Sequence, residues 1–346
     1  MAEEKRTELS DLGEFGLIRE LTKELTPRVE STVKSVGDDA AVIDKNEEEY
    51  QLISTDFLME GIHFDLSYTP LKHLGYKSIA VNVSDIAAMN GIPEQVTVSL
   101  AVSNRISYEA IRELYEGIEM ACKDYHIDLV GGDTTSSLSG FLISVSIIGK
   151  VQKKNVVYRS GAKVNDMICV TGDLGAAYVG LQLLEREKQV FLANEQMKPQ
   201  LEGNEYLIER ILKPQARMDV IHAFGGENFV PSAMIDVSDG LASELLHLSS
   251  QSDKGVEVWD ENIPIDNRTY EQALEFNIDP ATCALNGGED YELLFTCSED
   301  DYKKIEKLPD IHPIGKVTEK STGRKFVTKQ GNVYDLKAQG WNHFSE

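Results

Sequence analysis

Acidic residues stand beside glycines or small residues at the ends of several apolar runs in this chain. The segment "SVGDDAAVID" places Asp38 and Asp39 just before one such run, and "ISTDFLMEGIHF" places Asp56 at the end of another. In "LVGGDTTSS", Asp133 directly follows a Gly-Gly pair. Buried carboxylates must be paired, protonated or metal-bound, and basic residues are scarce in these segments. Oxygen ligands without His or Cys clusters indicate Mg²⁺ or a similar hard cation.

Asp85 is the acid that is hardest to explain as an ordinary structural residue. The pattern from Pro70 to Ala88 predicts a helix, in which Asp85 follows Val81 by four positions and precedes Ala88 by three. It therefore shares the apolar face of that helix. Comparable carboxylates in "MIDVSDG" and "NGGEDYELL" are Asp236, Asp239, Glu289 and Asp290.

Each acidic segment also has an ordinary structural interpretation. A lone Gly-Asp-Asp is most often a turn, and Asp133 could form an Asx-turn or cap a helix. Ser238 or Asp239 could start the helix that is expected at Leu241. The recurrence of such acids along the chain, together with the position of Asp85, favours a metal site.

Composition narrows the class of protein. The chain has 346 residues and a formal charge of −24. The length favours two domains, and the excess of acids argues against nucleic acid or an anionic membrane as the main partner. The four cysteines form no CxxC pair, the first residues resemble no secretory signal, and no apolar run is long enough to span a membrane, so we expect a cytoplasmic protein. P-loop, Rossmann, zincin and α/β-hydrolase motifs are absent from the sequence.

The hydrophobic periodicity predicts two α/β units. Strands are expected in "DAAVID", "YQLIST", "QVTVSLAV", "IDLVGG" and "GFLISVSIIGKV", and helices at about 70–88 and in "SYEAIRELYEGIEMACKDY". After Val151 the pattern starts again, with strands in "DMICVTG", "AMIDVSDG" and "YELLFTC". We therefore place a boundary near residue 152, which gives domains 1–152 and 153–346, each with a mixed sheet.

Eight motifs follow one another along the chain: "GDDAAV", "STDFLMEGIHF", "GYKSIAVNVSDIAAMNGIPE", "GGDTT", "RSGAKVNDMICVTGDLG", "IDVSDGLASEL", "GGEDYELLFT" and "GWNHF". In this order they resemble the thiamine-monophosphate kinases, a family of the aminoimidazole ribonucleotide synthetase-like superfamily that also includes selenophosphate synthetase. The match runs from about Gly13 to Phe344. Of these motifs, "DFLMEGIHF" best separates the family from its relatives.

The resemblance implies a fold and an activity. The fold is an N-terminal domain with a four-stranded sheet, which pairs with a second copy into a dimeric barrel, followed by a larger C-terminal mixed-sheet α/β domain. Residues 1–152 would bind metal and ATP and carry the dimer contact. The activity is transfer of the ATP γ-phosphate to thiamine monophosphate, giving thiamine diphosphate and ADP, with the help of several Mg²⁺ ions in a homodimer.

The family's motifs also imply roles for single residues. The metal ligands would be Asp38, Ser54, Thr55, Asp56, Asp85, Asp133, Asp236 and Asp239. The contacts to ATP would be Gly132, Asp133, Arg159 and Ser238. The contacts to thiamine monophosphate would be His63, Glu289 and Trp341. Structural alternatives stay open for His63, Arg159 and Trp341. Asp39 would support the ligands or form a turn, and Asp290 and residues 185–205 have no assigned role.

The chemistry of this reaction needs no general base. The acceptor is itself a phosphate that is largely ionised at neutral pH, and phosphoryl transfer depends on positioning and charge neutralisation. We therefore expect direct in-line transfer without a phosphoenzyme. One alternative is another ATP-dependent synthetase or ligase of the superfamily, which usually needs a reactive N-terminal cysteine, whereas the first cysteine here is Cys122. The other alternative is a non-catalytic cation- or nucleotide-binding module.

Overall fold

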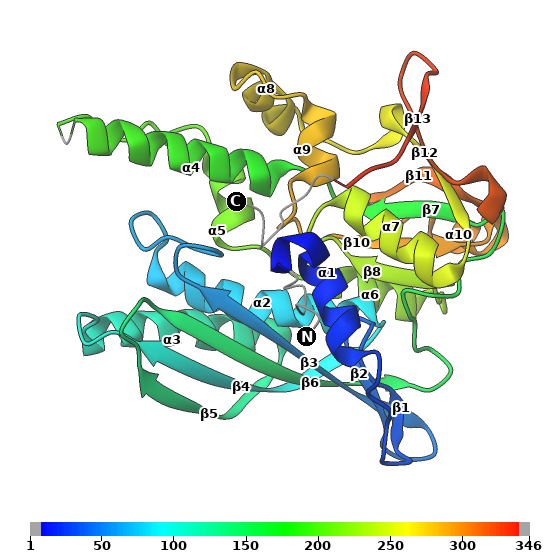
Figure 1. The fold of residues 1–346 in the computed structure, drawn as a ribbon, viewed down its shortest axis with the longest axis horizontal. Coiled ribbons are helices and arrows are strands. Elements are labelled where there is room, and N and C mark those ends of the chain that lie inside the picture. The colour runs from blue at the N-terminus through cyan, green and yellow to red at the C-terminus, as the bar shows by residue number, and fades with distance from the viewer. Residues whose placement is uncertain (1–7, 195, 339–346) are drawn as a thin grey trace, which may run out of the picture.

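The computed structural model describes residues 8–194 and 196–338, which form two mixed β-sheets with helices packed against them (Figure 1). This arrangement confirms the expected mixed α/β class. Trp341, a predicted substrate contact, lies outside the described residues.

The first sheet has six strands within the described residues, in the order β1-β2-β3-β6-β4-β5. The strands are β1 (Thr32–Lys34), β2 (Ala41–Asp44), β3 (Glu49–Met59), β4 (Ile92–Val102), β5 (Asp128–Ser136) and β6 (Leu142–Gln152). The expected count of four strands is therefore wrong. The reason is that the short segments on either side of Gly-Asp-Asp also pair into the sheet, with Asp44 opposite Tyr50. No barrel closes within the described part of this single chain.

Helices α2 (Leu71–Ala88) and α3 (Tyr108–Tyr125) cover one face of this sheet (Figure 1). The two helices approach closely because glycines face the neighbouring backbone: a side chain at Gly75 or Gly117 would collide with a carbonyl oxygen of the other helix. Residues of β6 alternate between buried and half-exposed, so only one face of the sheet is covered. Strand β5, at the edge, is exposed along its whole length.

The second sheet follows the order β13-β12-β9-β11-β7-β10-β8 in the described residues. Its strands are β7 (Met167–Thr171), β8 (Ala233–Asp236), β9 (Gly255–Trp259), β10 (Leu293–Cys297), β11 (Ile311–Thr318), β12 (Arg324–Val327) and β13 (Val333–Asp335). The helices of this half are α4 (Ala176–Ala193), α5 (Glu205–Leu212), α6 (Met218–Gly226), α7 (Leu241–Ser252), α8 (Asn267–Glu275), α9 (Pro280–Asn286) and α10 (Glu299–Ile305).

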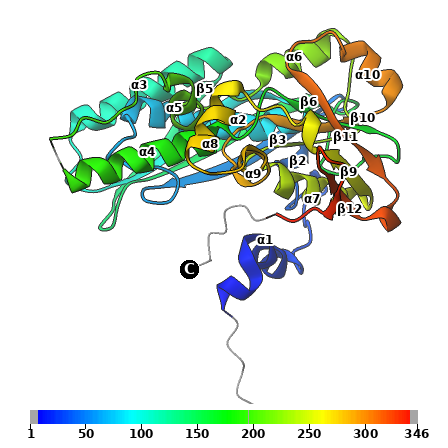
Figure 2. The same ribbon diagram turned by 90° about the horizontal axis from the view of Figure 1, so that it is seen from above.

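One apolar core joins the two halves of the chain. It includes Val145 from the first sheet and Phe295 from the second. Helix α1 (Leu9–Thr22) lies outside both sheet-and-helix units, and the ring of Phe15 meets His247 of α7 with ring centroids 4.3 Å apart (Figure 2). None of the described helices combines the length and the apolar character that crossing a membrane requires.

Candidate active site

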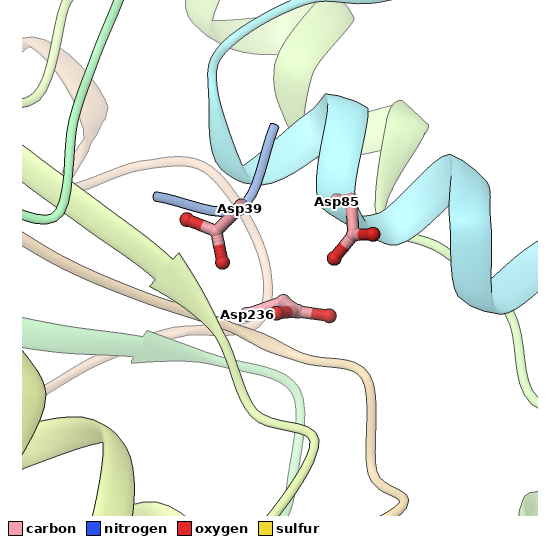
Figure 3. Close-up of side chains that lie close together, drawn as sticks. All are labelled: Asp39, Asp85 and Asp236. Atoms are coloured by element: carbon pink, nitrogen blue, oxygen red, sulfur yellow. The ribbon is translucent and has the colours of Figure 1, made fainter. Parts of the chain in front are cut away.

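Three carboxylates from distant segments converge between the two sheets. Asp39 comes from the turn before β2, Asp85 from the end of α2, and Asp236 from the last position of β8 (Figure 3). Each offers one oxygen, and these oxygens lie within 4.8 Å of one another. These acids come from one predicted helix and from the ends of two predicted strands. We call Asp39, Asp85 and Asp236 the carboxylate cluster.

Two serine hydroxyls bridge the members of the carboxylate cluster. Ser84 Oγ donates to Asp236 Oδ2 at 2.6 Å, so α2 is tied to the end of β8. Ser54 Oγ on β3 hydrogen-bonds the carboxylate of Asp85 and the main-chain oxygen of Asp39. The cluster is thus positioned by hydrogen bonds from the first sheet and from its covering helix.

Without a bound cation, burial disfavours the ionised form of the carboxylates in the cluster. It raises the pKa of Asp236 to about 7, with repulsion from Asp39 as the next cause. Burial also raises the pKa of Asp85, and repulsion from Asp56 is the next largest cause. For Asp56, burial raises the pKa to about 6. Asp39 Oδ2 is buried and has no hydrogen-bond partner among the described residues. An oxygen-only donor set with an orphaned carboxylate oxygen fits a hard divalent cation such as Mg²⁺.

Asp38 and Asp39, neighbours in the bend before β2, contact different groups of Arg159. Asp38 accepts the main-chain N–H of Arg159 at 3.0 Å and lies 3.5 Å from Lys34 Nζ. Asp39 enters the carboxylate cluster and also accepts two hydrogen bonds from the Arg159 guanidinium, at 2.7 and 3.1 Å. The structure therefore places Asp39 in the cluster, whereas the sequence had favoured Asp38.

The predicted ligands on β3 and β5 divide between the two faces of the sheet. Ser54 and Asp56 face α2, where Asn82 Oδ1 accepts the main-chain N–H of Asp56 at 3.1 Å. Thr55 points the other way and donates to the carbonyl oxygen of Val145 at 2.9 Å. The strand register puts Asp133 on the same face as Thr55. These two residues are therefore separated from the carboxylate cluster by the sheet.

A groove of about 870 Å³ runs between α3 and β5, and a recess of about 480 Å³ continues it. Tyr115 and Leu129 line both hollows, and the recess reaches Gly132 and Asp133. Gly132 has φ +157°, and a side chain there would collide with the carbonyl oxygen of Val98. Only glycine therefore lets β5 approach β4 at the floor of this recess.

The remaining predicted contacts lie in loops. Ser238 accepts the main-chain N–H of Glu289 at 2.7 Å through its own carbonyl oxygen. The main-chain N–H of Asp239 donates to buried Glu244 at 2.8 Å. His63 lies in the turn after β3, where its Nδ1 accepts the main-chain N–H of Met59 at 3.1 Å. This contact fixes the His63 ring against its own turn, and a contact of His63 with substrate stays a prediction.

Comparison with known proteins bears on this geometry. The family model for AIR synthase related protein, N-terminal domain, matches residues 37–151. The thiamine-monophosphate kinase of Bacillus subtilis is 35% identical over 96% of this chain and 100% of the relative, and that of Aquifex aeolicus is 34% identical over 97% and 99%. The chain belongs to the thiamine-monophosphate kinase family. The resemblance inferred from the motifs is confirmed.

Solved structures agree with the family and with its fold. The structure described as AaThiL complexed with AMPPCP and TMP superposes with a TM-score of 0.84 at 33% identity, covering 98% of this chain and 99% of the other. The hydrogenase maturation protein HypE in complex with ATP has a TM-score of 0.68 at 16% identity, which shows a shared fold alone. The mixed α/β architecture of this thiamine-monophosphate kinase family member is thus common to more distant proteins.

Asp290, which had no assigned role, caps a helix in this family member. Its carboxylate accepts the main-chain N–H groups of Gly175 and Ala177, at 2.7 and 3.3 Å, at the N-terminus of α4. Burial nevertheless raises the pKa of Asp290 to about 7. The carboxylate supplies the negative charge and the acceptors that a helix N-terminus lacks.

The sequence interpretation missed several polar residues of α2. Lys77, Ser78, Asn82 and Ser84 are all buried in this helix. A signal was present, because four polar residues interrupt a helix that is apolar on most of its surface. Buried polar groups need specific partners, and these partners differ. Lys77 and Ser84 bond to the second half of the chain, whereas Asn82 accepts from β3 of the first sheet and Ser78 bonds within α2.

Glu292→Gln is expected to lower the free energy of unfolding by about 3 kcal/mol. Glu292 is buried and pairs with Arg210 at 2.9 Å and Arg217 at 2.6 Å, and Thr171 donates to it at 2.6 Å. Removing its charge leaves two largely enclosed guanidinium groups without their shared partner. Urea denaturation measures the loss, with exposed Glu299→Gln as the control. A change below about 1 kcal/mol would contradict the importance of this network.

Proposed function

We propose that this protein transfers the γ-phosphate of ATP to thiamine monophosphate, giving thiamine diphosphate and ADP. The observation that carries the proposal is the buried carboxylate cluster of Asp39, Asp85 and Asp236, with an orphaned oxygen on Asp39. Support also comes from the relatives that are named thiamine-monophosphate kinase, and from the similar structure that contains AMPPCP and TMP.

The carboxylate cluster would hold Mg²⁺, with Asp56 beside it. When bound, Mg²⁺ neutralises and orients phosphate oxygens, which relieves the repulsion between the two phosphate chains. Of the Gly-Asp-Asp pair, Asp39 is the proposed ligand, and Asp38 holds the turn through Arg159 and Lys34. The other predicted ligands are Ser54, Thr55, Asp133 and Asp239. Because Thr55 and Asp133 lie on the opposite face of the sheet, they would hold a separate ion.

The chain's own residues would position both phosphate chains without acting as a general base. Arg159 would reach the nucleotide phosphates from its place beside Asp39, since a planar guanidinium matches phosphate oxygens. Ser238 would join it at the end of β8. Glu289, His63 and Trp341 would contact thiamine monophosphate, with the Glu289 carboxylate facing its cationic or amino part. No residue in this scheme forms a phosphorylated intermediate.

The groove between α3 and β5 would take the nucleotide base. It leads into the recess at Gly132 and Asp133, the predicted ATP contacts, and the half-buried ring of Tyr115 lines both hollows. Tyr115→Ala is expected to raise the KM for ATP about tenfold, because base–aromatic stacking is worth roughly 1–3 kcal/mol. The KM for thiamine monophosphate should stay unchanged.

Steady-state kinetics with each substrate varied in turn measures this effect. Tyr108→Ala removes an exposed tyrosine from the same helix and serves as the matched control. An unchanged KM for ATP in Tyr115→Ala would place the base elsewhere.

The oligomer and the domain division extend the proposal. A homodimer would use the exposed strand β5 and the uncovered face of the first sheet, since a bare sheet edge invites pairing with another chain. The barrel expected for this family would then form between two copies. The boundary between domains 1–152 and 153–346 would fall directly after β6. A cytoplasmic location agrees with four buried free cysteines.

The activity is tested by incubating the pure protein with ATP, Mg²⁺ and thiamine monophosphate. The expected result is thiamine diphosphate and ADP in equal amounts, resolved by chromatography. Release of ADP without thiamine diphosphate, only with another acceptor, would favour a synthetase or ligase. Binding of nucleotide without turnover would favour the non-catalytic module.

A further inference from the structure

Lys77 is a buried cation at the junction of the two halves of the chain. Its side chain is only 3% exposed, and Nζ lies 2.6 Å from Glu289 Oε2. The same ammonium donates to the carbonyl oxygen of Ile211 at 3.3 Å, in the last turn of α5. A buried ammonium is unfavourable unless it is paired, and a carbonyl at a helix C-terminus is a suitable second acceptor. Lys77 is therefore held at a defined position by two partners from the second half.

The loop that carries Glu289 is constrained on both sides of it. Glu289 and Tyr291 both have positive φ, +63° and +53°, which non-glycine residues rarely adopt. Their main-chain N–H groups donate to Ser238 and Val237. Asp290 accepts from the N-terminus of α4. Backbone of this kind persists only where its surroundings hold it, and functional sites are where it concentrates.

The position of Glu289 beside other acids makes its cationic partner important. The Glu289 carboxylate lies near enough to the carboxylate of Asp56 for the two charges to repel each other. A carboxylate that is free to rotate would move away from Asp56 and lose its orientation. The ion pair with Lys77 opposes that movement, because it gives the Glu289 carboxylate a fixed attractive partner.

Lys77 and Asp85 belong to the same helix, α2. Eight residues of helix correspond to roughly 12 Å along the axis. A rigid helix thus separates the member of the carboxylate cluster from the residue that holds Glu289. With Glu289 in its proposed role, the length of this segment would set the distance between the carboxylate cluster and the part of the acceptor that Glu289 contacts.

We propose that Lys77 is a positioning residue for thiamine monophosphate: it orients the Glu289 carboxylate and fixes its distance from the carboxylate cluster through α2. This inference rests on the proposed role of Glu289 in binding that substrate. Lys77 acts through Glu289, so the two side chains form one functional unit. Substitution of either should affect the acceptor substrate and leave the nucleotide unaffected.

The test compares Lys77→Met, Lys77→Gln and Lys77→Arg with Glu289→Gln and with the double variant Lys77→Met/Glu289→Gln. We expect Lys77→Met and Glu289→Gln each to raise the KM for thiamine monophosphate by about 10- to 100-fold, with the KM for ATP changed less than about twofold. The double variant should be no worse than either single variant. Lys77→Arg should recover part of the affinity. Calorimetric titration of thiamine monophosphate into protein with AMPPCP measures binding apart from turnover.

Controls separate the possible failures. Lys72→Met removes an exposed lysine from the same helix and should change nothing. If Lys77→Met does not fold, Lys77→Gln is used in its place, because glutamine keeps a hydrogen-bond donor on a side chain of similar length. An unchanged KM in Glu289→Gln overturns the proposed role of Glu289. A raised KM in Glu289→Gln together with an unchanged KM in Lys77→Met and Lys77→Gln, or additive effects in the double variant, overturns the positioning role of Lys77.

Discussion

Asp85→Asn is expected to lower kcat by about a thousandfold or more while the protein stays folded. The carboxylate shares the cluster with Asp39 and Asp236, and the orphaned oxygen of Asp39 points to a cation among them. An amide of the same shape removes one negative ligand, and charge neutralisation is the main contribution that phosphoryl transfer takes from its site. A thousandfold loss corresponds to about 4 kcal/mol of transition-state stabilisation.

The fold should tolerate this substitution because the carboxylate is unfavourable without a cation. Burial and repulsion from Asp56 and Asp236 raise the pKa of Asp85, so removing its charge relieves repulsion. The thermal midpoint of the metal-free variant should equal or exceed that of the parent protein. Circular dichroism and a thermal scan in EDTA check this point.

Two further variants make the Asp85 experiment specific. Asp39→Asn should match the loss of Asp85→Asn, whereas Asp38→Asn should cost less, because Asp38 contacts Arg159 and Lys34 rather than the cluster. Asp300→Asn, at a fully solvated position of α10, serves as the control. Activity near the parent level in both Asp85→Asn and Asp39→Asn would remove the metal interpretation.

Metal removal is expected to make stability depend strongly on pH. In EDTA, the free energy of unfolding should fall by several kcal/mol as the pH rises from about 4 to 7. The pKa of Asp236 is raised to about 7 and that of Asp56 to about 6, so both bind protons more tightly in the folded state. Their contribution is present below the pKa of the unfolded chain and is lost as the pH rises through the folded values.

Mg²⁺ should remove most of this loss, because it binds the ionised carboxylates of the folded state and stabilises them increasingly over the same pH range. Groups away from the cluster titrate without the cation, among them Asp173, Asp290 and His247. Burial raises the pKa of Asp290 to about 7, which acts in the same direction, and lowers the pKa of His247 to about 4, which adds stability as the pH rises. These contributions remain when Mg²⁺ is present, so the difference between the two conditions isolates the cluster.

Thermal unfolding in EDTA and in Mg²⁺, from pH 4 to pH 8, measures the effect. Asp236→Asn should reduce the pH dependence in EDTA and also the stabilisation by Mg²⁺. Identical curves with and without Mg²⁺ across the whole range would be incompatible with a cation site in the carboxylate cluster.

The sequence by itself determined the family, the mixed α/β class and two of the three acids of the carboxylate cluster, Asp85 and Asp236. Asp85 could be placed on a buried face because a helical period assigns faces without knowledge of the fold. Asp236 could be placed at a strand end because an apolar run stops there. These inferences depend on periodicity and on the rule that buried charge needs a partner, both of which act locally.

Tertiary structure alone decided which residues meet. The choice between Asp38 and Asp39 depends on the direction of two neighbouring side chains: both contact Arg159, but only Asp39 also approaches Asp85 and Asp236. The separation of Thr55 from Asp56 depends on strand register, which assigns adjacent residues to opposite faces. The pairing of Lys77 with Glu289 joins residues far apart in the chain, and only the packing of α2 against the second half brings them within 2.6 Å. Such contacts arise from the arrangement of whole elements, which local sequence patterns do not contain.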